Sequence, residues 1–141
     1  MSQTTDYIAN DYLIKQQEID FLFGYLAINP LDSVLLFLKD NECVIHNEFE
    51  IRNFIIGNPS VADYLYEAPS IIFKYFGRVR MSLELFLDPE IKNDNGKLFL
   101  NILTDLEPKE ALDKLGKIDK EWLLSVIGSD ISKFNINIEI I

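Results

Sequence analysis

The sharpest chemical possibility in the sequence is a cysteine followed three residues later by a histidine. Cys43 and His46 are the only residues of their types in the chain. On a helix they would share a face, where a thiol and an imidazole can act as nucleophile and base, whereas on a strand they would point in opposite directions. A zinc site would need three or four ligands, so carboxylates would have to complete it. We expect both residues to be packing or surface residues, because no oxyanion-hole glycines accompany them.

Carboxylates are the other abundant reactive groups. The loop from Asp88 to Gly96 has a calcium-loop composition, but its register is wrong for an EF-hand: with Gly96 at the sixth position, Ile91 and Ile102 fill the first and twelfth, where carboxylates are required. Carboxylate pairs can perform acid–base chemistry, but among 23 acidic residues such pairs are expected by chance and do not indicate a catalytic site. We therefore expect no catalytic, cofactor-binding or metal-binding residue, and the sequence favours a non-enzymatic protein over an enzyme.

The charge balance narrows the choice of partners. The chain has 13 basic and 23 acidic residues among 141, a net charge of −10. Such a surface repels phosphate backbones and anionic lipids, so we expect neither a nucleic-acid nor a membrane partner. The short basic cluster of Lys74, Arg78 and Arg80 is interpreted as solvated charges near the start of a strand.

The apolar segments, the N-terminal residues and the single cysteine predict where the protein is located. The longest apolar stretch, Phe21–Ile28, is shorter than the span of about 20 residues that crosses a bilayer. The N-terminal residues lack the pattern of a signal peptide, and the single cysteine fits a reducing compartment. We therefore expect a cytoplasmic protein.

Apolar residues recur at helical spacing through residues 6–76. Asn29-Pro30 and Gly57-Asn58-Pro59 interrupt this spacing, because the residue before a proline is disfavoured in a helix. Ser60 is a suitable N-cap, Gly77 a suitable C-terminal stop, and Pro69 is expected to kink or split the helix between them. The predicted helices are Tyr7–Ile28, Asp32 or Ser33 to Leu38, Glu48–Ile56, and Ser60–Phe76.

The remaining residues alternate strand and helix patterns. Leu83, Leu85 and Leu87 alternate with Glu84, Phe86 and Asp88, which is the period of a strand. Turn residues that end at Gly96 follow, and residues 98–103 show a second alternation. Together these segments predict a β-hairpin. Pro108 begins a helix whose apolar stripe runs to Trp122. The cleanest alternation covers Phe134–Ile140 and predicts a final strand.

These elements predict an α+β fold with one domain over residues 1–141, mainly helical to residue 76 and β-β-α-β over 79–141. Connection rules favour a three-stranded mixed sheet of order 2-1-3, with the C-terminal helix on one face. Phe86, Phe99 and Leu103 fall on the other face, to be covered by the N-terminal helices or a partner. Trp122 is a core-rim residue or an interface anchor, since tryptophan is frequent at binding hot spots. The predicted partner surface is therefore Phe86, Phe99, Leu103 and Trp122.

Several segments resemble a group of short, uncharacterised bacterial proteins over about Ser60–Ile141. The group often has a second tryptophan where this chain has Leu123. The resemblance implies no catalytic residue; it implies a gene of the kind found in paired, toxin–antitoxin-like loci. The segments that carry it are Glu67-Ala68-Pro69, Tyr75-Phe76-Gly77, Leu83-Glu84-Leu85 with Asp88-Pro89-Glu90, Leu98-Phe99-Leu100 with Ile102 and Thr104, Pro108-Lys109-Glu110-Ala111-Leu112, Asp119-Lys120-Glu121-Trp122 and Asn137-Ile138-Glu139.

The sequence thus predicts a non-enzymatic interaction or regulatory protein, such as the acidic member of a two-protein pair. An acidic surface accelerates association with a basic partner, and salt weakens that effect. Two alternatives stay open: a metal-dependent enzyme that uses carboxylates, and a structural homodimer.

Overall fold

The computed structural model describes residues 30–92 and 95–141. The chain divides into two compact units, Met1–Ser33 and Val34–Ile141. The helix predicted at Tyr7–Ile28 lies outside the described residues, so the prediction of one domain over the whole chain stays a prediction. The described elements from residue 34 onward form the second unit.

The helices predicted before residue 77 are confirmed where the structure describes them. α2 spans Pro30–Asp40, α3 spans Glu48–Gly57 and α4 spans Ser60–Phe76. Between α2 and α3, the chain forms a three-residue strand, β2 (Cys43–Ile45), which the sequence pattern does not reveal.

Pro69 neither splits α4 nor ends it. The helix continues through the proline, which is buried with its neighbours Leu65, Ala68 and Ile72. A proline at this position removes the backbone hydrogen bond to the Leu65 carbonyl. Burial of the apolar residues around it offsets that loss, so the expectation of a split helix is wrong.

The ends of α4 also differ in how they are stabilised. Ser60 is the first helical residue, the N-cap position belongs to Pro59, and no side chain caps the helix there. Gly77 ends the helix as predicted: it has φ 74°, and its N–H donates to the Phe73 carbonyl. A positive φ of this size favours glycine, since it has no Cβ.

The C-terminal half contains the predicted hairpin, helix and final strand. β3 (Arg80–Phe86) and β4 (Lys97–Thr104) are antiparallel, α5 covers Pro108–Ile118, and β5 covers Phe134–Ile140. Between α5 and β5 the chain forms two further helical segments. The first, η1 (Asp119–Ile127), is a nine-residue π-helix, and the second, η2 (Gly128–Ser132), is a 3₁₀ helix.

The sheet has four strands in the order β2-β3-β4-β5, so the predicted three-stranded sheet of order 2-1-3 is wrong. β2 pairs with β3 in parallel and occupies the edge that the prediction assigned to the last strand. β5 therefore pairs with the other free edge, in parallel with β4. The β4–α5–β5 segment is thereby a β-α-β unit, whose two strands are adjacent.

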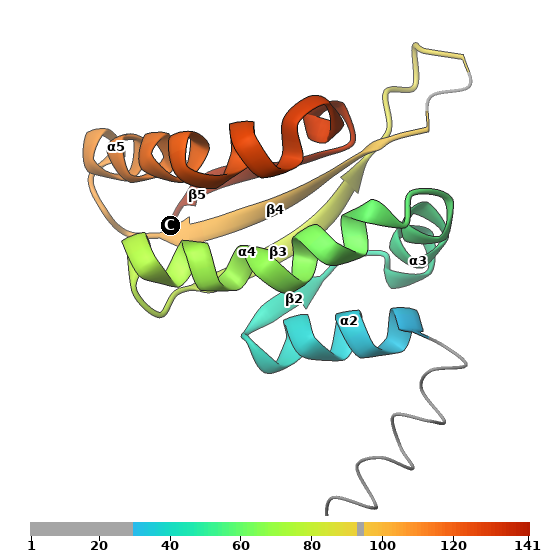
Figure 1. The fold of residues 1–141 in the computed structure, drawn as a ribbon, viewed down its shortest axis with the longest axis horizontal. Helices are drawn as coiled ribbons and strands as arrows, with labels where there is room; N and C mark the ends of the chain where they lie inside the picture. Colours follow the sequence, from blue (N-terminus) through green and yellow to red (C-terminus); the bar gives the residue numbers. More distant parts are fainter. Residues whose placement is uncertain (1–29, 93–94) are drawn as a thin grey trace, which may run out of the picture. The chain divides into compact units, whose positions relative to one another are not determined.

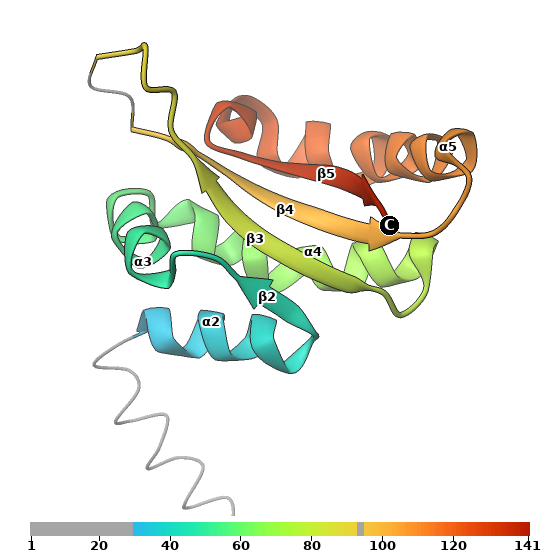
Figure 2. The same cartoon turned by 180° about the vertical axis from the view of Figure 1, so that it is seen from behind.

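α4 and α5 lie on the same side of this sheet, and the reverse view shows β3 in front of α4 (Figure 1 and Figure 2). One face is thus covered by the C-terminal helix as predicted, but α4 packs on that same face and does not cover the face that carries Phe86, Phe99 and Leu103. The side chains of Leu98, Leu100 and Ile102 on β4 point to the helices and are fully buried. They form the core with Met81 and Leu83 of β3, Phe134 and Ile136 of β5, and apolar residues of α2, α3, α4, α5 and η1.

The opposite side of the sheet, which we call the open face, has no described helix over β3, β4 and β5 (Figure 2). Because side chains alternate along a strand, the strand register decides which residues it carries. Its members, by that register, are Val44, Arg80, Ser82, Glu84, Phe86, Lys97, Phe99, Asn101, Leu103, Asn135, Asn137 and Glu139.

Within the described residues, no helix has the length and apolar character needed to cross a membrane.

Candidate binding site between α4 and the π-helix

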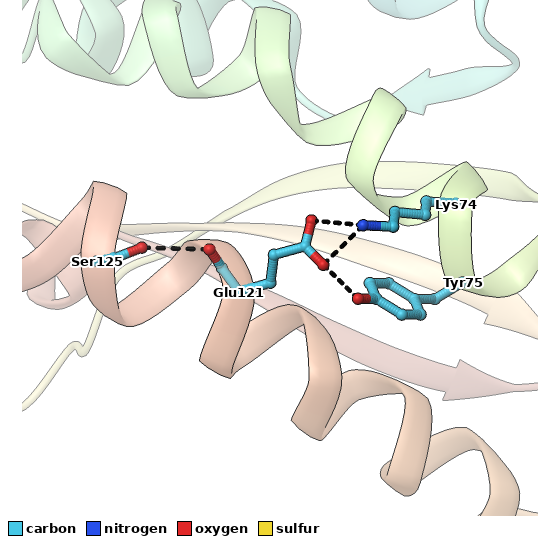
Figure 3. A network of polar contacts seen from close by, with 4 residues as sticks. All are labelled: Lys74, Tyr75, Glu121 and Ser125. Atoms are coloured by element: carbon cyan, nitrogen blue, oxygen red, sulfur yellow. Dashed lines mark hydrogen bonds and ion pairs between the residues drawn. The ribbon is translucent and has the colours of Figure 1, made fainter.

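The carboxylate of Glu121, on the π-helix, is held by two residues of α4. Lys74 Nζ donates to both carboxylate oxygens, at 2.8 and 2.9 Å, and the Tyr75 hydroxyl donates to one of them (Figure 3). The Ser125 hydroxyl donates to the Glu121 backbone carbonyl at 3.2 Å, one turn further along the π-helix. Three donors from two elements thus fix the position of Glu121.

These hydrogen bonds keep Glu121 and Lys74 ionised. Donation from Lys74 and Tyr75 lowers the pKa of Glu121 below its ordinary value of 4.5. Hydrogen bonding to Glu121 raises the pKa of Lys74 above 10.5 and that of Tyr75 above 10.0. All three pKa values move away from neutrality, so these groups are suited to a fixed electrostatic role and are poorly suited to proton transfer near pH 7.

The next residue of the π-helix, Trp122, makes a second contact to α4. Its ring is 6% exposed, and its indole N–H donates to Oε1 of Glu67 at 3.2 Å. The Tyr64 ring meets the Trp122 ring edge-on, with centroids 6.5 Å apart. The indole is therefore a buried wall of the site with one polar contact to a surface carboxylate.

Two consecutive residues can reach α4 because they lie on a π-helix. A π-turn closes with an i→i+5 hydrogen bond, so it contains more residues than an α-turn and successive side chains are separated by a smaller angle. Glu121 and Trp122 consequently point to the same neighbouring helix. Short π segments are frequent at functional sites, where they redirect particular side chains.

This π-helix was not predicted, although the sequence contains a signal for it. The predicted stripe through Trp122 is a four-residue pattern, but the buried residues beyond it follow a five-residue pattern. Ile118 and Leu123 are buried and five residues apart, as are Trp122 and Ile127. That spacing matches the π-helical hydrogen bond.

A third contact joins α4 to the end of the helical segment. The Tyr64 hydroxyl donates to Oδ2 of Asp130 at 2.7 Å, and the Ser60 hydroxyl donates to the same oxygen at 3.2 Å. The Tyr64 hydrogen bond lowers the pKa of Asp130 and raises that of Tyr64. Polar contacts thus join α4 to three residues of the following helical segments, namely Glu121, Trp122 and Asp130.

A pocket of about 430 Å³ opens between these two elements. This volume lies within the roughly 300–1,000 Å³ typical of ligand sites. Trp122 and Ile71 form its buried apolar wall, while two carboxylates and one ammonium group supply its charges. Its lining residues are Tyr66, Glu67, Ser70, Ile71, Lys74, Glu121 and Trp122.

The two carboxylates of the pocket are in different states. Glu121 is already neutralised by Lys74, whereas the contact described for Glu67 is the neutral indole N–H of Trp122. Among the described residues no cation pairs with Glu67, which therefore supplies a negative charge beside an aromatic wall. This combination favours an ammonium or guanidinium group, which can pair with the carboxylate and stack on the ring.

Three of the four residues predicted for a partner surface lie together, and the fourth does not. Phe86, Phe99 and Leu103 share the open face, where Phe86 is 52% exposed and the other two are half-buried. Trp122 lies on the helix side of the sheet and lines the pocket. The Phe86–Phe99–Leu103 face and the Trp122 pocket are therefore two separate candidate surfaces.

Cys43 and His46 do not form a nucleophile–base pair. Cys43 is buried on strand β2, and burial raises the pKa of its thiol to about 12. His46 is exposed, and its backbone N–H donates to the Leu83 carbonyl. Because its buried thiol stays protonated, Cys43 is poorly suited to act as a nucleophile beside the exposed His46.

Over residues 30–92 and 95–141, no three His, Cys, Asp or Glu side chains are arranged to hold a metal ion.

No protein-family model, curated protein or solved structure matches this chain.

Proposed function

We propose that this protein is a non-enzymatic interaction protein of regulatory type, the acidic member of a two-protein pair, and that it binds a basic partner at the α4–η1 pocket. The observation that carries the proposal is the carboxylate of Glu67, which has no cationic partner within residues 30–92 and 95–141 and lies beside the buried Trp122 ring. An arginine or lysine side chain of the partner would enter the pocket and pair with Glu67.

The charged groups around the pocket support binding more than catalysis. Lys74 and Glu121 form a salt bridge at 2.8 Å, with pKa values shifted in the directions that preserve both charges. Such a pair holds the pocket wall in place without exchanging protons near neutral pH. A preorganised wall lowers the entropy cost of accepting a partner side chain.

The charge of the whole chain supports the same kind of partner. At a net charge of −10, long-range attraction favours encounter with a basic protein and falls as salt screens it. The pocket would then provide the specific contact that long-range attraction lacks. For the alternative of a metal-dependent enzyme, the described residues contain no group of three His, Cys, Asp or Glu side chains that could hold the metal ion.

The test compares two variants that each remove one negative charge. Glu67→Gln keeps an oxygen that accepts the Trp122 N–H, so it removes the charge and preserves the local hydrogen bond. Glu110→Gln removes an exposed charge on α5 outside the pocket. The tagged wild type and both variants are used to capture proteins from an extract of the native host at low and high salt.

We expect the wild type and Glu110→Gln to retain the same basic protein at low salt, and Glu67→Gln to lose most of it. Equal capture by the two variants would exclude the pocket as the binding site. Repeated failure of the wild type to capture a specific protein at low salt would contradict the proposed function itself.

A further inference from the structure

The open face carries opposite charges on the two strands that flank β4. The strand register gives three rows across β3, β4 and β5: Arg80–Leu103–Glu139, Ser82–Asn101–Asn137 and Glu84–Phe99–Asn135. In the first row, an arginine on β3 and a glutamate on β5 flank a leucine on β4. Both charged residues are exposed, and they are separated by the width of β4.

The centre of the face is rigid and partly apolar. Asn101 is 5% exposed, and its amide donates to the Ser82 hydroxyl at 3.2 Å and to Glu84 Oε1 at 2.9 Å. Phe99 and Leu103 lie on either side of Asn101 along β4 and are half-buried. A firm face with exposed apolar area is typical of an interaction surface.

From this arrangement we infer that the open face binds the open face of a second copy, with a twofold axis that runs along β4. That axis places β4 against β4 and places β3 of one copy against β5 of the other. Phe99 and Leu103 then meet the same residues of the second copy. Arg80 meets Glu139 of the second copy, and this contact forms twice, once on each side of the axis.

The same twofold rotation also brings complementary polar residues of the two copies together. Glu84 of one copy faces Asn135 of the other, and Ser82 faces Asn137. The Asn135 side-chain oxygen already accepts the Ile136 N–H at 2.8 Å, which leaves its amide as a donor. A carboxylate opposite an amide donor is a favourable pair, so this row also supports the parallel arrangement.

An axis perpendicular to the strands gives a much poorer match. It would place Arg80 against Phe86 and Leu103 against Lys97, which buries positive charge on apolar groups without a counter-ion. The parallel arrangement places Lys97 opposite Lys97 of the second copy at one end of the interface. There each ammonium lies 5.4 Å from the centroid of its own Phe99 ring, and the long side chain reaches solvent.

Overall charge also favours this face for self-association. Two copies with a net charge of −10 repel each other over most of their surfaces. On the open face, Arg80 and Lys97 balance Glu84 and Glu139, so two positive and two negative side chains give a net charge of zero. Repulsion is therefore weakest where the apolar residues and the complementary charges occur.

The test uses charge reversal followed by restoration. The full chain is measured by light scattering over a range of concentrations as wild type, Arg80→Glu, Glu139→Arg and the double variant. Lys120→Glu and Glu110→Arg are the matched controls, since they make the same charge changes at exposed positions on η1 and α5. Far-UV circular dichroism verifies that each variant is folded.

We expect the wild type to have twice the chain mass of 16.3 kDa. Each single reversal should weaken dimerisation by about tenfold or more, because two opposite-charge pairs become two like-charge pairs. The double variant should dimerise like the wild type, since the two introduced charges would again be opposite and would face each other across the interface. The controls should change little.

A second measurement tests the position of the axis. In a Cys43→Ala background, a short bismaleimide reagent should crosslink Leu103→Cys between copies, because the two introduced thiols would face each other across the axis. Sheets packed face to face lie about 10 Å apart, which a crosslinker spans and a direct disulfide does not. Glu110→Cys should give no crosslinked dimer under the same treatment. A monomeric wild type, intact dimers in the single reversals, no recovery in the double variant, or no crosslink in Leu103→Cys would each overturn the inference. Because the proposed α4–η1 pocket lies on the other side of the sheet, its own test is independent of this result.

Discussion

The hydrogen bond between Trp122 and Glu67 should couple the π-helix energetically to α4. A double-mutant cycle with Trp122→Phe and Glu67→Ala measures this coupling directly. Trp122→Phe keeps an aromatic ring but removes the indole N–H and part of a side chain that is 6% exposed. We expect it to lower the free energy of unfolding by about 2–3 kcal/mol, of which roughly 1–2 kcal/mol is lost packing.

The coupling energy itself should be close to 1 kcal/mol. Hydrogen bonds to charged groups contribute about 1.5–3 kcal/mol, and two features of this one reduce its strength. Its N···O distance of 3.2 Å is long, and the Glu67 side chain is exposed to water. The double variant should therefore be more stable, by about 1 kcal/mol, than the sum of the single effects implies.

The assay is urea unfolding followed by far-UV circular dichroism, because Trp122 is the only tryptophan and fluorescence would be lost in one arm of the cycle. A control cycle pairs Trp122→Phe with Glu110→Ala, which lies outside the pocket and should show no coupling. A Trp122–Glu67 coupling energy within about 0.3 kcal/mol of zero would refute the view that this contact joins the two elements.

The backbone at two glycines and the pKa shifts of Cys43 and Glu121 give four further predictions. Gly116→Ala should stabilise the protein by about 0.5–1 kcal/mol because Gly116 lies inside α5, and a Cβ there has open space. Gly96→Ala should lower the melting temperature, because Gly96 has φ 91° and a Cβ would lie 2.9 Å from Leu87 Cδ2; equal melting temperatures for the two variants would contradict this. The Cys43 thiol, whose pKa is raised from 9.0 to about 12, should react slowly with thiol reagents in the folded chain. Stability should fall between pH 9 and 12, where only the unfolded chain loses that proton, and should fall less in Cys43→Ala. Because the pKa of Glu121 lies below its ordinary 4.5, stability should decrease as the pH drops below that value. Glu121→Gln should lack this contribution to acid unfolding while Glu110→Gln keeps it, as chemical denaturation at several pH values would show.

Local patterns predicted most of the described elements because their signals are local. The alternation over Phe134–Ile140 defines β5 at both ends, and Gly77 ends α4 through its backbone conformation. The hairpin follows from two alternating segments around turn residues. Each of these signals depends on neighbouring residues in the chain, so it can be recognised without knowledge of the tertiary structure.

The errors occur where tertiary contacts override local preference. Pro69 remains inside α4 because its surroundings are buried, and burial of that kind cannot be read from the residue type. β2 has only three residues, too few for an alternation to be recognised, and the parallel pairing with β3 stabilises it. The pocket was missed for the related reason that its wall depends on a π-helix, for which a four-residue pattern was assumed.

The error in strand order has a consequence for function, because the order decides which residues are neighbours on the open face. If β5 lay beside β3, as the order 2-1-3 requires, Arg80 would occupy the central strand and Glu139 could pair with it inside the same chain. In the observed order, β4 is between them, and Arg80 and Glu139 remain on opposite sides of the face. Within the described part of the chain, Arg80 and Glu139 do not pair with each other, so both charges stay available for the proposed contact with a second copy. By occupying the free edge of β3, the short strand β2 is what allows the proposed pairing.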